Sequence, residues 1–340
     1  MEAQQKQQTS DSDTPISYTS LDYLVSKYSY FLFDCDGVLW TGEKQVPHVF
    51  EAIHMLINHP EYSQTKKVFL VTNNSTRTRH QVLNEKLKNY GFHDSGLKEN
   101  QIYTSAYVTA KYLSKALQTP THQHHTHHNS KPKVYVVGEQ GLKDEMKLNG
   151  IEVVNGKNED DEEHSDANVS MGADEIGTRE VEEGVGAVVC GINYSFSYRK
   201  LCMASLYIQL NEAKFIATNI DRYLTTQVKD RHMPAGGSIV NCISYGTQVQ
   251  PIVIGKPQQH IFDVLREEHG LLEEPLSKFL MVGDSLITDI RFGNNCGIST
   301  LCVLSGNTTE AKIKEIFIKG LRNEDEGVPT YISPYFGFNS

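Results

Sequence analysis

Two carboxylates, those of Asp34 and Asp36, lie in the segment Asp34-Cys35-Asp36-Gly37, directly after the apolar run Phe31–Phe33. Such a pair can divide the work of phosphoryl transfer, because one carboxylate can attack phosphorus while the other protonates the leaving oxygen and later activates water. Like charges this close repel each other, so the site needs a cation, and magnesium prefers the oxygens of carboxylates and phosphates. Taken alone, the pattern is also common on surface turns.

Polar residues also follow a second apolar run, Val68–Val71, as Thr72-Asn73-Asn74-Ser75. A hydroxyl group and the backbone amides of this turn could hold phosphoryl oxygens. The alternative is that the turn caps a helix over residues 76–90. The two interpretations are compatible.

A lysine and two further aspartates follow two later apolar runs. Lys256, after Ile252–Ile254, can neutralise phosphate or carboxylate charge, or else it is a solvated surface lysine. Asp284, after Phe279–Val282, can ligate the cation. Asp289 can orient the ligands or, as the alternative, place a favourable charge near a helix N-terminus.

The four apolar runs predict strands of one parallel sheet. Each run is short, continuous and followed by a helix-compatible stretch, as expected for buried strands that alternate with helices. Because active sites of such sheets lie at the carboxyl ends of the strands, we expect the four polar clusters to converge on one crevice.

A second α/β unit lies between the second and third of these runs. We expect strands at 134–137, 151–154, 185–190 and 215–218, and helices at 140–148 and 198–210. The predicted fold is therefore an α/β, Rossmann-like parallel-sheet core (16–103 and 236–340) with an inserted α/β cap domain at 104–235. Residues 1–15, 119–132 and 155–184 lack apolar periodicity and are predicted to be disordered.

Composition narrows the function classes. The formal net charge of the 340 residues is −10, and the segment 159–183, with eleven acids and one base, accounts for all of it. No basic stripe points to nucleic acid, and no apolar window approaches the roughly 18 residues of a membrane helix. The polar N-terminus has no signal-peptide pattern, so we expect a cytoplasmic protein, with a nuclear fraction as the alternative.

Taken together, the order of these motifs resembles the haloacid dehalogenase superfamily of phosphatases, and the position of the insertion fits one cap class of that superfamily. The similarity extends over about residues 29–306, outside the two low-complexity insertions. Within the superfamily the sequence looks like the branch with 4-nitrophenyl phosphatases, phosphoglycolate phosphatase and pyridoxal phosphatase. The segments that carry it are FDCDGVLWTG, FLVTNNSTRTR, YVVGEQGL, FIATNID, GKPQQHIFDVL and MVGDSLITDIRFG.

The resemblance implies a role for each matching residue. Asp34 would be the nucleophile and Asp36 the general acid and base. Mg²⁺ would be bound by Asp34, the backbone carbonyl of Asp36 and Asp284, with Asp289 in support. Thr72, Asn73 and Asn74 would bind phosphate, and Lys256 would steady the transferred group. The resemblance also implies a homodimer formed through the cap.

Some positions depart from the pattern of that branch. Ser285 stands where an arginine is usual, Asn193 replaces an aspartate, and Pro234-Ala235-Gly236-Gly237 varies a more regular turn. None of these removes a predicted catalytic residue, so they bear on substrate preference. The segment Asn219–Met233, which follows a predicted cap strand, is expected to contact the leaving group.

The sequence therefore predicts an Mg²⁺-dependent phosphatase of small phosphorylated metabolites that works through an aspartyl phosphate. Phosphoglycolate-like acids are the first expected substrates, with 4-nitrophenyl phosphate as an artificial one. Pyridoxal phosphate phosphatase and protein phosphatase are the alternatives within this class. Outside it, a receiver-like signalling module or a phosphometabolite-binding regulatory protein remains, whereas a dinucleotide-binding oxidoreductase lacks its glycine-rich motif.

Overall fold

The computed structural model describes residues 17–117, 132–154, 172–225, 231–320 and 323–337. The predicted tail at 1–15 lies outside these ranges, as do residues 119–131 and 155–171 of the predicted insertions. Among the described residues, no helix is both long enough and apolar enough to cross a membrane.

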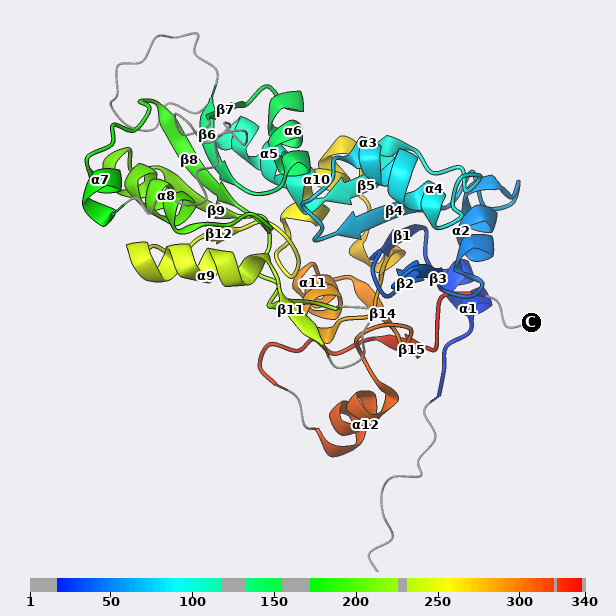
Figure 1. The fold of residues 1–340 in the computed structure, drawn as a ribbon. Coiled ribbons are helices and arrows are strands. Elements are labelled where there is room, and N and C mark those ends of the chain that lie inside the picture. The colour runs from blue at the N-terminus through cyan, green and yellow to red at the C-terminus, as the bar shows by residue number, and fades with distance from the viewer. Residues whose placement is uncertain (1–16, 118–131, 155–171, 226–230, 321–322, 338–340) are drawn as a thin grey trace, which may run out of the picture.

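The core is a six-stranded sheet in which every neighbouring pair of strands is parallel (Figure 1). Its order is β15-β14-β13-β1-β4-β5. The chain passes from the central strand β1 to one side and later fills the other side, so the order reverses beside β1. The strands are β1 (Tyr30–Phe33), β4 (Lys67–Thr72), β5 (Ile102–Thr104), β13 (Phe279–Gly283), β14 (Ser299–Val303) and β15 (Tyr331–Ser333).

Alternate side chains of β1, β4, β5 and β13 enter two separate hydrophobic clusters, because successive residues of a strand point to opposite faces. Phe31 and Phe33 pack on one face with α1 (Leu21–Lys27) and α2 (Val49–Asn58). Leu32 packs on the other face with α5 (Ser105–Ala116) and α10 (His260–Glu268). Burial on both faces explains why these strands have continuous apolar sequences.

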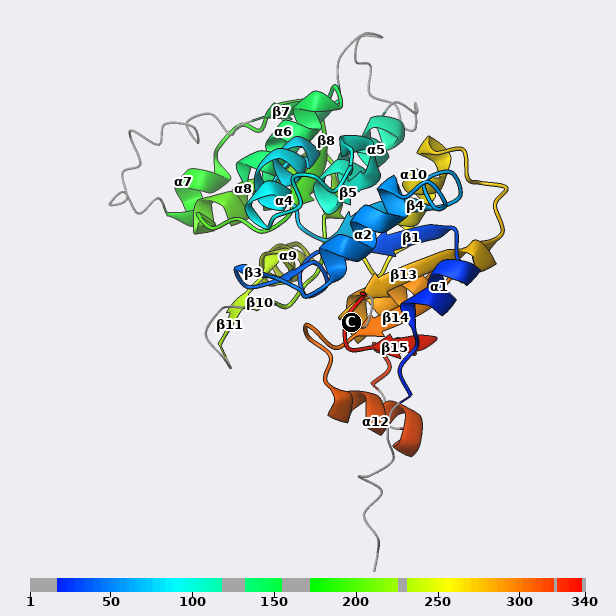
Figure 2. The ribbon, with the colours of Figure 1, turned by 90° about the vertical axis from the view of Figure 1, so that its right-hand side faces the viewer.

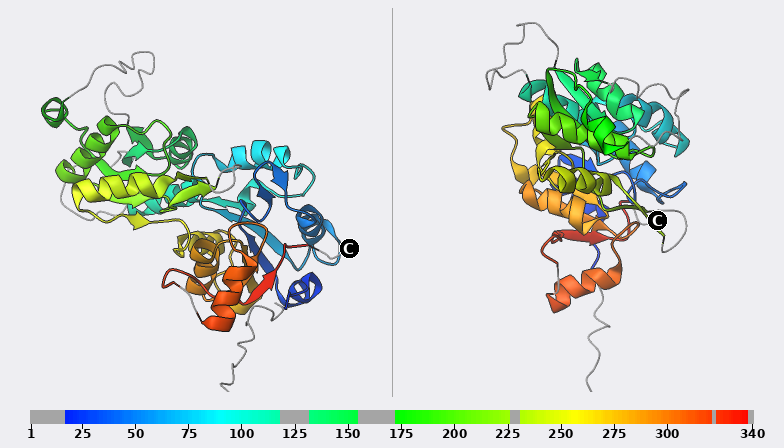
Figure 3. Two further views of the ribbon diagram at one scale, coloured as in Figure 1. Left: turned by 60° about the horizontal axis from the view of Figure 1, so that its bottom comes forward. Right: turned by 60° about the vertical axis from the view of Figure 1, so that its left-hand side comes forward.

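The inserted unit has its own parallel sheet, in the order β12-β9-β8-β6-β7. One of its faces shares a cluster with the core through α5 and α6, and the other packs against α8 and α9. Figures 2 and 3 show this unit beside the core from three further sides. Its elements are β6 (Lys133–Val137), α6 (Gln140–Leu148), β7 (Glu152–Val154), α7 (Ala173–Gly177), β8 (Val185–Cys190), α8 (Tyr198–Leu210), β9 (Lys214–Ala217), α9 (Gly236–Thr247) and β12 (Ile252–Val253). The predicted α/β core with an inserted α/β unit is confirmed.

Two predictions about this unit need correction. The apolar run at 252–254 was expected in the core sheet, but Ile252 and Val253 pair with β9 of the inserted sheet, and α9 packs there through Val240 and Ile243. Residues 236–253 thus lie with the inserted unit, not with the core. Residues 172–184 were expected to be disordered, but they contain α7, whose Ile176 is buried in the same cluster.

Shorter elements complete the described chain. A hairpin of β2 (Trp40–Thr41) and β3 (Lys44–Gln45) follows β1, and β10 (Tyr223–Thr225) pairs with β11 (His232–Pro234) after β9. The remaining helical segments are α3 (Arg79–Gln81), η2 (Val82–Lys86), α4 (Leu87–Asn89), η3 (Glu99–Gln101), η5 (Leu276–Lys278), η6 (Leu286–Ile290), α11 (Arg291–Asn295) and α12 (Glu310–Lys319).

Candidate active site

Asp34 and Asp284 come together because their strands are neighbours. Asp34 follows β1 and Asp284 follows β13, and these two strands pair in register over four residues. The backbone N–H of Asp34 donates to the carbonyl of Val282 at 2.9 Å, which extends the ladder by one more residue. Both side chains therefore emerge at the carboxyl edge of the sheet, beside the point where the strand order reverses.

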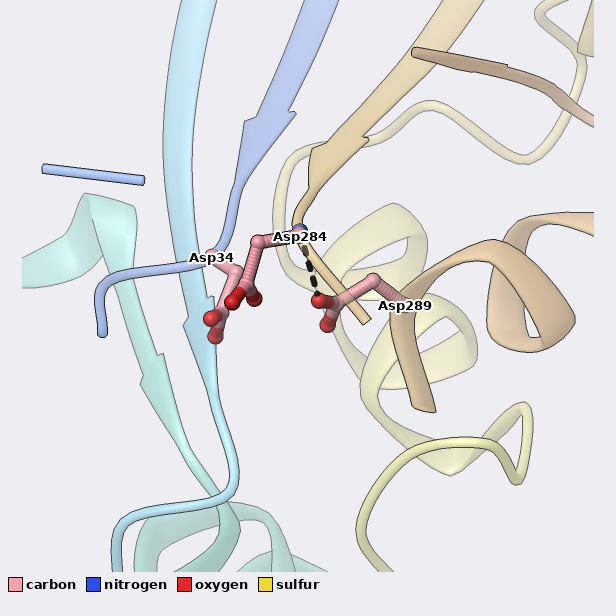
Figure 4. A group of neighbouring side chains, drawn as sticks. All are labelled: Asp34, Asp284 and Asp289. Carbon is pink, nitrogen blue, oxygen red and sulfur yellow. Dashed lines mark hydrogen bonds between the residues drawn. The ribbon is translucent and has the colours of Figure 1, made fainter. Parts of the chain in front are cut away.

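Asp289 joins this pair from the first turn after β13. Carboxylate oxygens of Asp34, Asp284 and Asp289 lie within 4.8 Å of one another, and all three residues are buried (Figure 4). One oxygen of Asp289 accepts hydrogen bonds from the backbone N–H groups of Asp284 and Ser285, both at 3.1 Å. Asp289 therefore shapes the turn that carries Asp284 as well as adding a charge.

Lys256 is the cation at the centre of this group. Its side chain is 2% exposed, and its Nζ donates to Asp34 at 2.6 Å, to Asp289 at 2.7 Å and to the carbonyl of Val71 at 2.9 Å. The sequence left open a solvated surface lysine, and the burial of Lys256 excludes it. Three carboxylates face one ammonium group, so the fully ionised cluster carries an excess of negative charge.

Burial and mutual repulsion shift the titration of these groups. Burial, followed by the charge of Asp289, raises the pKa of Asp34 to about 7 even though Lys256 opposes the shift. Burial also raises the pKa of Asp284 well above its ordinary value, with Asp289 and Asp34 adding to the effect. Burial alone would lower the pKa of Lys256, but Asp289 and Asp34 outweigh it and hold that pKa above its usual range.

Asp284 is also held by a loop that the sequence analysis did not identify. The backbone N–H of Asn307 donates to its carboxylate at 2.6 Å, and the hydroxyl of Thr308 donates to its carbonyl at 2.6 Å. A Cβ at Gly37, where φ is +90°, would collide with the same carboxylate. The loop follows β14, so a polar cluster after an apolar run was again the signal that could have revealed it.

Asp36 does not share the buried cluster. Its side chain is 60% exposed, and one carboxylate oxygen accepts from Trp40 Nε1 at 2.7 Å and from Lys86 Nζ at 3.2 Å. The ammonium group of Lys86 also lies 4.7 Å from the centre of the Trp40 ring. The two aspartates of the motif thus have different environments, because Asp34 is buried among charges and Asp36 is exposed to solvent.

The turn after β4 is arranged by its own side chains. Thr72 accepts from the backbone N–H of Asn74 at 3.1 Å, and Asn74 accepts from that of Thr76 at 3.0 Å. The following helix begins at Arg79 and is capped by Thr78, so the turn at 72–75 is not its N-cap. The carboxamide of Asn73 bonds the main chain of Lys256.

The departures from the family pattern have local structural roles. Ser285 caps η6 by accepting from the backbone N–H of Thr288. The amide of Asn193 donates to the carbonyl of Gly138 at 3.1 Å within the inserted unit. Gly237 lies at the start of α9, where a Cβ would come within 2.5 Å of the carbonyl oxygen of Ile220.

Comparison with known proteins identifies the family. A model of the haloacid dehalogenase-like hydrolases matches residues 31–152, and a second, HAD-hydrolase-like model matches residues 253–332. A 4-nitrophenylphosphatase of Schizosaccharomyces pombe is 34% identical over 86% of this chain and 88% of its own. A chloroplastic phosphoglycolate phosphatase of Arabidopsis thaliana is 35% identical over 85% of this chain and 72% of its own.

The chain belongs to the haloacid dehalogenase-like hydrolases. It is a phosphatase of this family. The fold agrees, because the structure of a 4-nitrophenylphosphatase from Thermotoga maritima superposes with a TM-score of 0.68 over 92% of this chain and 97% of its own, at 24% identity. The resemblance that the motifs predicted is thereby confirmed. In this hydrolase Asp34, Asp284 and Asp289 lie at the carboxyl edge of the core sheet, and Lys256 reaches them from the end of the inserted sheet.

Proposed function

We propose that this hydrolase is an Mg²⁺-dependent phosphomonoesterase of small phosphorylated metabolites that works through an aspartyl phosphate. The observation that carries the proposal is the buried cluster of Asp34, Asp284 and Asp289 around Lys256. A phosphate ester brings further negative charge, so the cluster needs a cation of more than one charge before it can accept such a substrate.

The donor set fits magnesium. Buried carboxylate oxygens within 4.8 Å of one another are hard ligands that are close enough to share one cation. Asp34 and Asp284 would hold the ion with the backbone carbonyl of Asp36, and Asp289 would fix the turn at Asp284. When bound, the ion supplies positive charge that offsets the phosphate oxygens.

The protein residues then divide the reaction. An oxygen of Asp34 attacks phosphorus, the bond to the leaving oxygen breaks, and Asp36 donates a proton to that oxygen. Asp36 next takes a proton from water, which attacks phosphorus and releases phosphate from Asp34. Lys256 and the turn at 72–74 stabilise charge on the transferred group.

We expect Asp36→Asn to lower kcat by about 10² to 10⁴-fold, because it removes the general acid and base. With 4-nitrophenyl phosphate, whose leaving group needs little protonation, the first step should survive better than the second. Stopped-flow measurement should therefore show a burst of 4-nitrophenolate followed by slow turnover. Asp22→Asn, which changes an exposed aspartate, is the matched control. If Asp36→Asn turned over at the wild-type rate without a burst, Asp36 would not be the general acid and base.

The reaction class and the substrate are tested in one assay. Purified protein is given 4-nitrophenyl phosphate, 2-phosphoglycolate, pyridoxal phosphate and a phosphopeptide, with and without Mg²⁺, and released phosphate is measured. The proposal predicts Mg²⁺-dependent release, with the highest kcat/KM on a small metabolite. A preference for pyridoxal phosphate or the phosphopeptide would select one of the alternative phosphatases. No release from any of them would favour a binding protein.

The cap-mediated homodimer also stays a prediction. Sedimentation equilibrium of the full chain would check it, with twice the monomer mass of 38.3 kDa expected. A species of monomer mass at micromolar concentration would contradict it.

A further inference from the structure

Asn73 lies where the turn after β4 meets Lys256 and the inserted unit. Its Nδ2 donates to the carbonyl of Lys256 at 3.0 Å and to the carboxylate of Asp221 at 3.1 Å. Its Oδ1 accepts from the backbone N–H of Lys256 at 2.8 Å. A carboxamide offers two donors and one acceptor oxygen, so these bonds use each of its functions. The Asn73 side chain holds protein groups and is not free to bind phosphate.

The segment that follows β9 is also hydrogen-bonded to the turn at 72–75. Asn219 donates to the carbonyl of Asn73 at 2.8 Å, two residues before Asp221. At Gly255, a Cβ would lie 2.5 Å from the carbonyl oxygen of Thr218 and 2.6 Å from Oδ1 of Asn73. Real side chains do not approach so closely, so glycine is what lets the three segments meet. The end of an inserted-unit strand is thus packed directly on the turn at 72–75 and on the segment that carries Lys256.

Asp221 supports the orientation of the Asn73 carboxamide that the backbone groups of Lys256 require. A carboxylate only accepts hydrogen bonds, so it faces the NH₂ group. With the carboxamide reversed, its oxygen would face both this carboxylate and the carbonyl of Lys256, and the N–H of Lys256 would lose its acceptor. Asp221 therefore favours the one orientation in which Asn73 clamps both backbone groups of Lys256.

We propose that Asp221 is a positioning residue of the phosphatase, acting through Asn73 on Lys256. Lys256 is held at both ends, by Asn73 at its main chain and by Asp34 and Asp289 at its ammonium group. Loosening the main-chain end lets the ammonium group shift relative to the reacting phosphate. A misplacement of about 1 Å can cost roughly 10²-fold in rate. The inference rests on the proposed function, because it assigns Lys256 to the transferred phosphoryl group.

This role differs from direct contact with the leaving group, which was the expectation for the segment Asn219–Met233. A residue that touches the leaving group affects each substrate differently and raises KM. A residue that positions Lys256 acts on the group common to all substrates. We therefore expect Asp221→Ala to lower kcat by about 10 to 10²-fold, by a similar factor for every substrate, with KM changed less than about threefold.

The experiment compares Asp221→Ala, Asp221→Asn, Asn73→Ala and the double variant Asn73→Ala/Asp221→Ala on 4-nitrophenyl phosphate, 2-phosphoglycolate and pyridoxal phosphate. Asp221→Asn should recover most of kcat, because its amide oxygen still accepts from Asn73. The double variant should be no slower than Asn73→Ala alone, because both changes break one chain of contacts. Asp174→Ala, an exposed acid on α7, is the control and should be unaffected.

The outcomes separate this inference from the proposed function. If the wild type is active, three results would overturn the positioning role alone. They are an Asp221→Ala variant with unchanged kcat, additive losses of kcat in the double variant, and a loss that differs among substrates and comes with a raised KM. An inactive wild type would overturn the proposed function and this inference with it. Urea unfolding of the same four variants should give non-additive shifts in midpoint, and additive shifts would contradict the contact between Asp221 and Asn73 without recourse to activity.

Discussion

Asp34→Asn should lower kcat by at least about 10⁴-fold, because removing a covalent nucleophile abolishes the route that the other groups serve. The change is nearly isosteric, and the amide oxygen of the substituted side chain can still accept from Lys256, so phosphate binding and folding should survive. After an acid quench, radiolabelled substrate should leave label on the wild type and none on Asp34→Asn. Asp22→Asn again serves as the exposed control.

The same variant has a stability readout that does not depend on turnover. The pKa of Asp34 is about 7 in the folded chain, compared with about 4 in an unfolded one. For a carboxyl group whose pKa is raised by folding, its contribution to stability is present below about pH 4 and is lost as the pH rises through 7. An asparagine at this position does not ionise, so its contribution to stability does not fall as the pH rises. In metal-free buffer, Asp34→Asn should therefore match the wild type in unfolding free energy near pH 4 and exceed it at pH 8.

Two results would contradict this account of Asp34. Turnover within about tenfold of the wild type would exclude it as the nucleophile, and label retained in the variant would place the covalent intermediate elsewhere. A metal-free Asp34→Asn that unfolds more easily than the wild type at pH 8 would mean that the attraction to Lys256 outweighs burial and the charge of Asp289. Because the two readouts are independent, failure of one does not hide the other.

Elements with strong local patterns could be predicted to the residue. The helices at 140–148 and 198–210 and the strand at 185–190 have the predicted bounds, because periodicity and caps are local properties. The apolar run at 252–254 could not be assigned to the right sheet. Both sheets are parallel, so a short apolar run fits either one, and only its pairing with β9, at the edge of the inserted sheet, decides.

In the candidate site, too, some features follow from local sequence and others depend on tertiary packing. That Asp34, Asp284 and Asp289 meet was predictable, because Asp34 and Asp284 follow neighbouring strands and Asp289 lies in the next turn. Lys256 also joins them, but it follows β12 of the inserted sheet and not the core strand on which its placement was based. The orientation of Asp36 toward Trp40 and Lys86 could not be predicted. Its partners belong to a hairpin and a helix, and the motif does not encode how these pack. Thr78 caps its helix by a local rule, but Thr72 and Ser75 are residue types that fit the same rule, so the sequence alone does not choose among them. In the structure Thr72 instead accepts from the backbone N–H of Asn74 within the turn.

Metal removal should have the second large effect, because three buried carboxylates face one lysine. With excess EDTA, phosphate release should stop, and Mg²⁺ should restore it. Mg²⁺ at about 100 times its Kd should stabilise the fold by about 2.7 kcal/mol, seen as a rise in Tm. The rise should be larger at pH 8 than at pH 6, because Asp34 and Asp284 have raised pKa values and must lose protons to bind the ion.

A specific site is distinguished from charge screening by two controls. KCl at matched ionic strength screens charges without occupying a carboxylate site. When it is added to the EDTA-treated protein in place of Mg²⁺, it should restore neither Tm nor activity. Asp284→Asn removes a ligand while keeping the hydrogen bond from Asn307, so it should lose the Mg²⁺-dependent rise in Tm, whereas Asp22→Asn keeps it. If EDTA left turnover and Tm unchanged, Lys256 alone would have to offset the three carboxylates. The raised pKa of Asp34 would then mean that a shared proton, and not a metal ion, relieves the repulsion in the active enzyme.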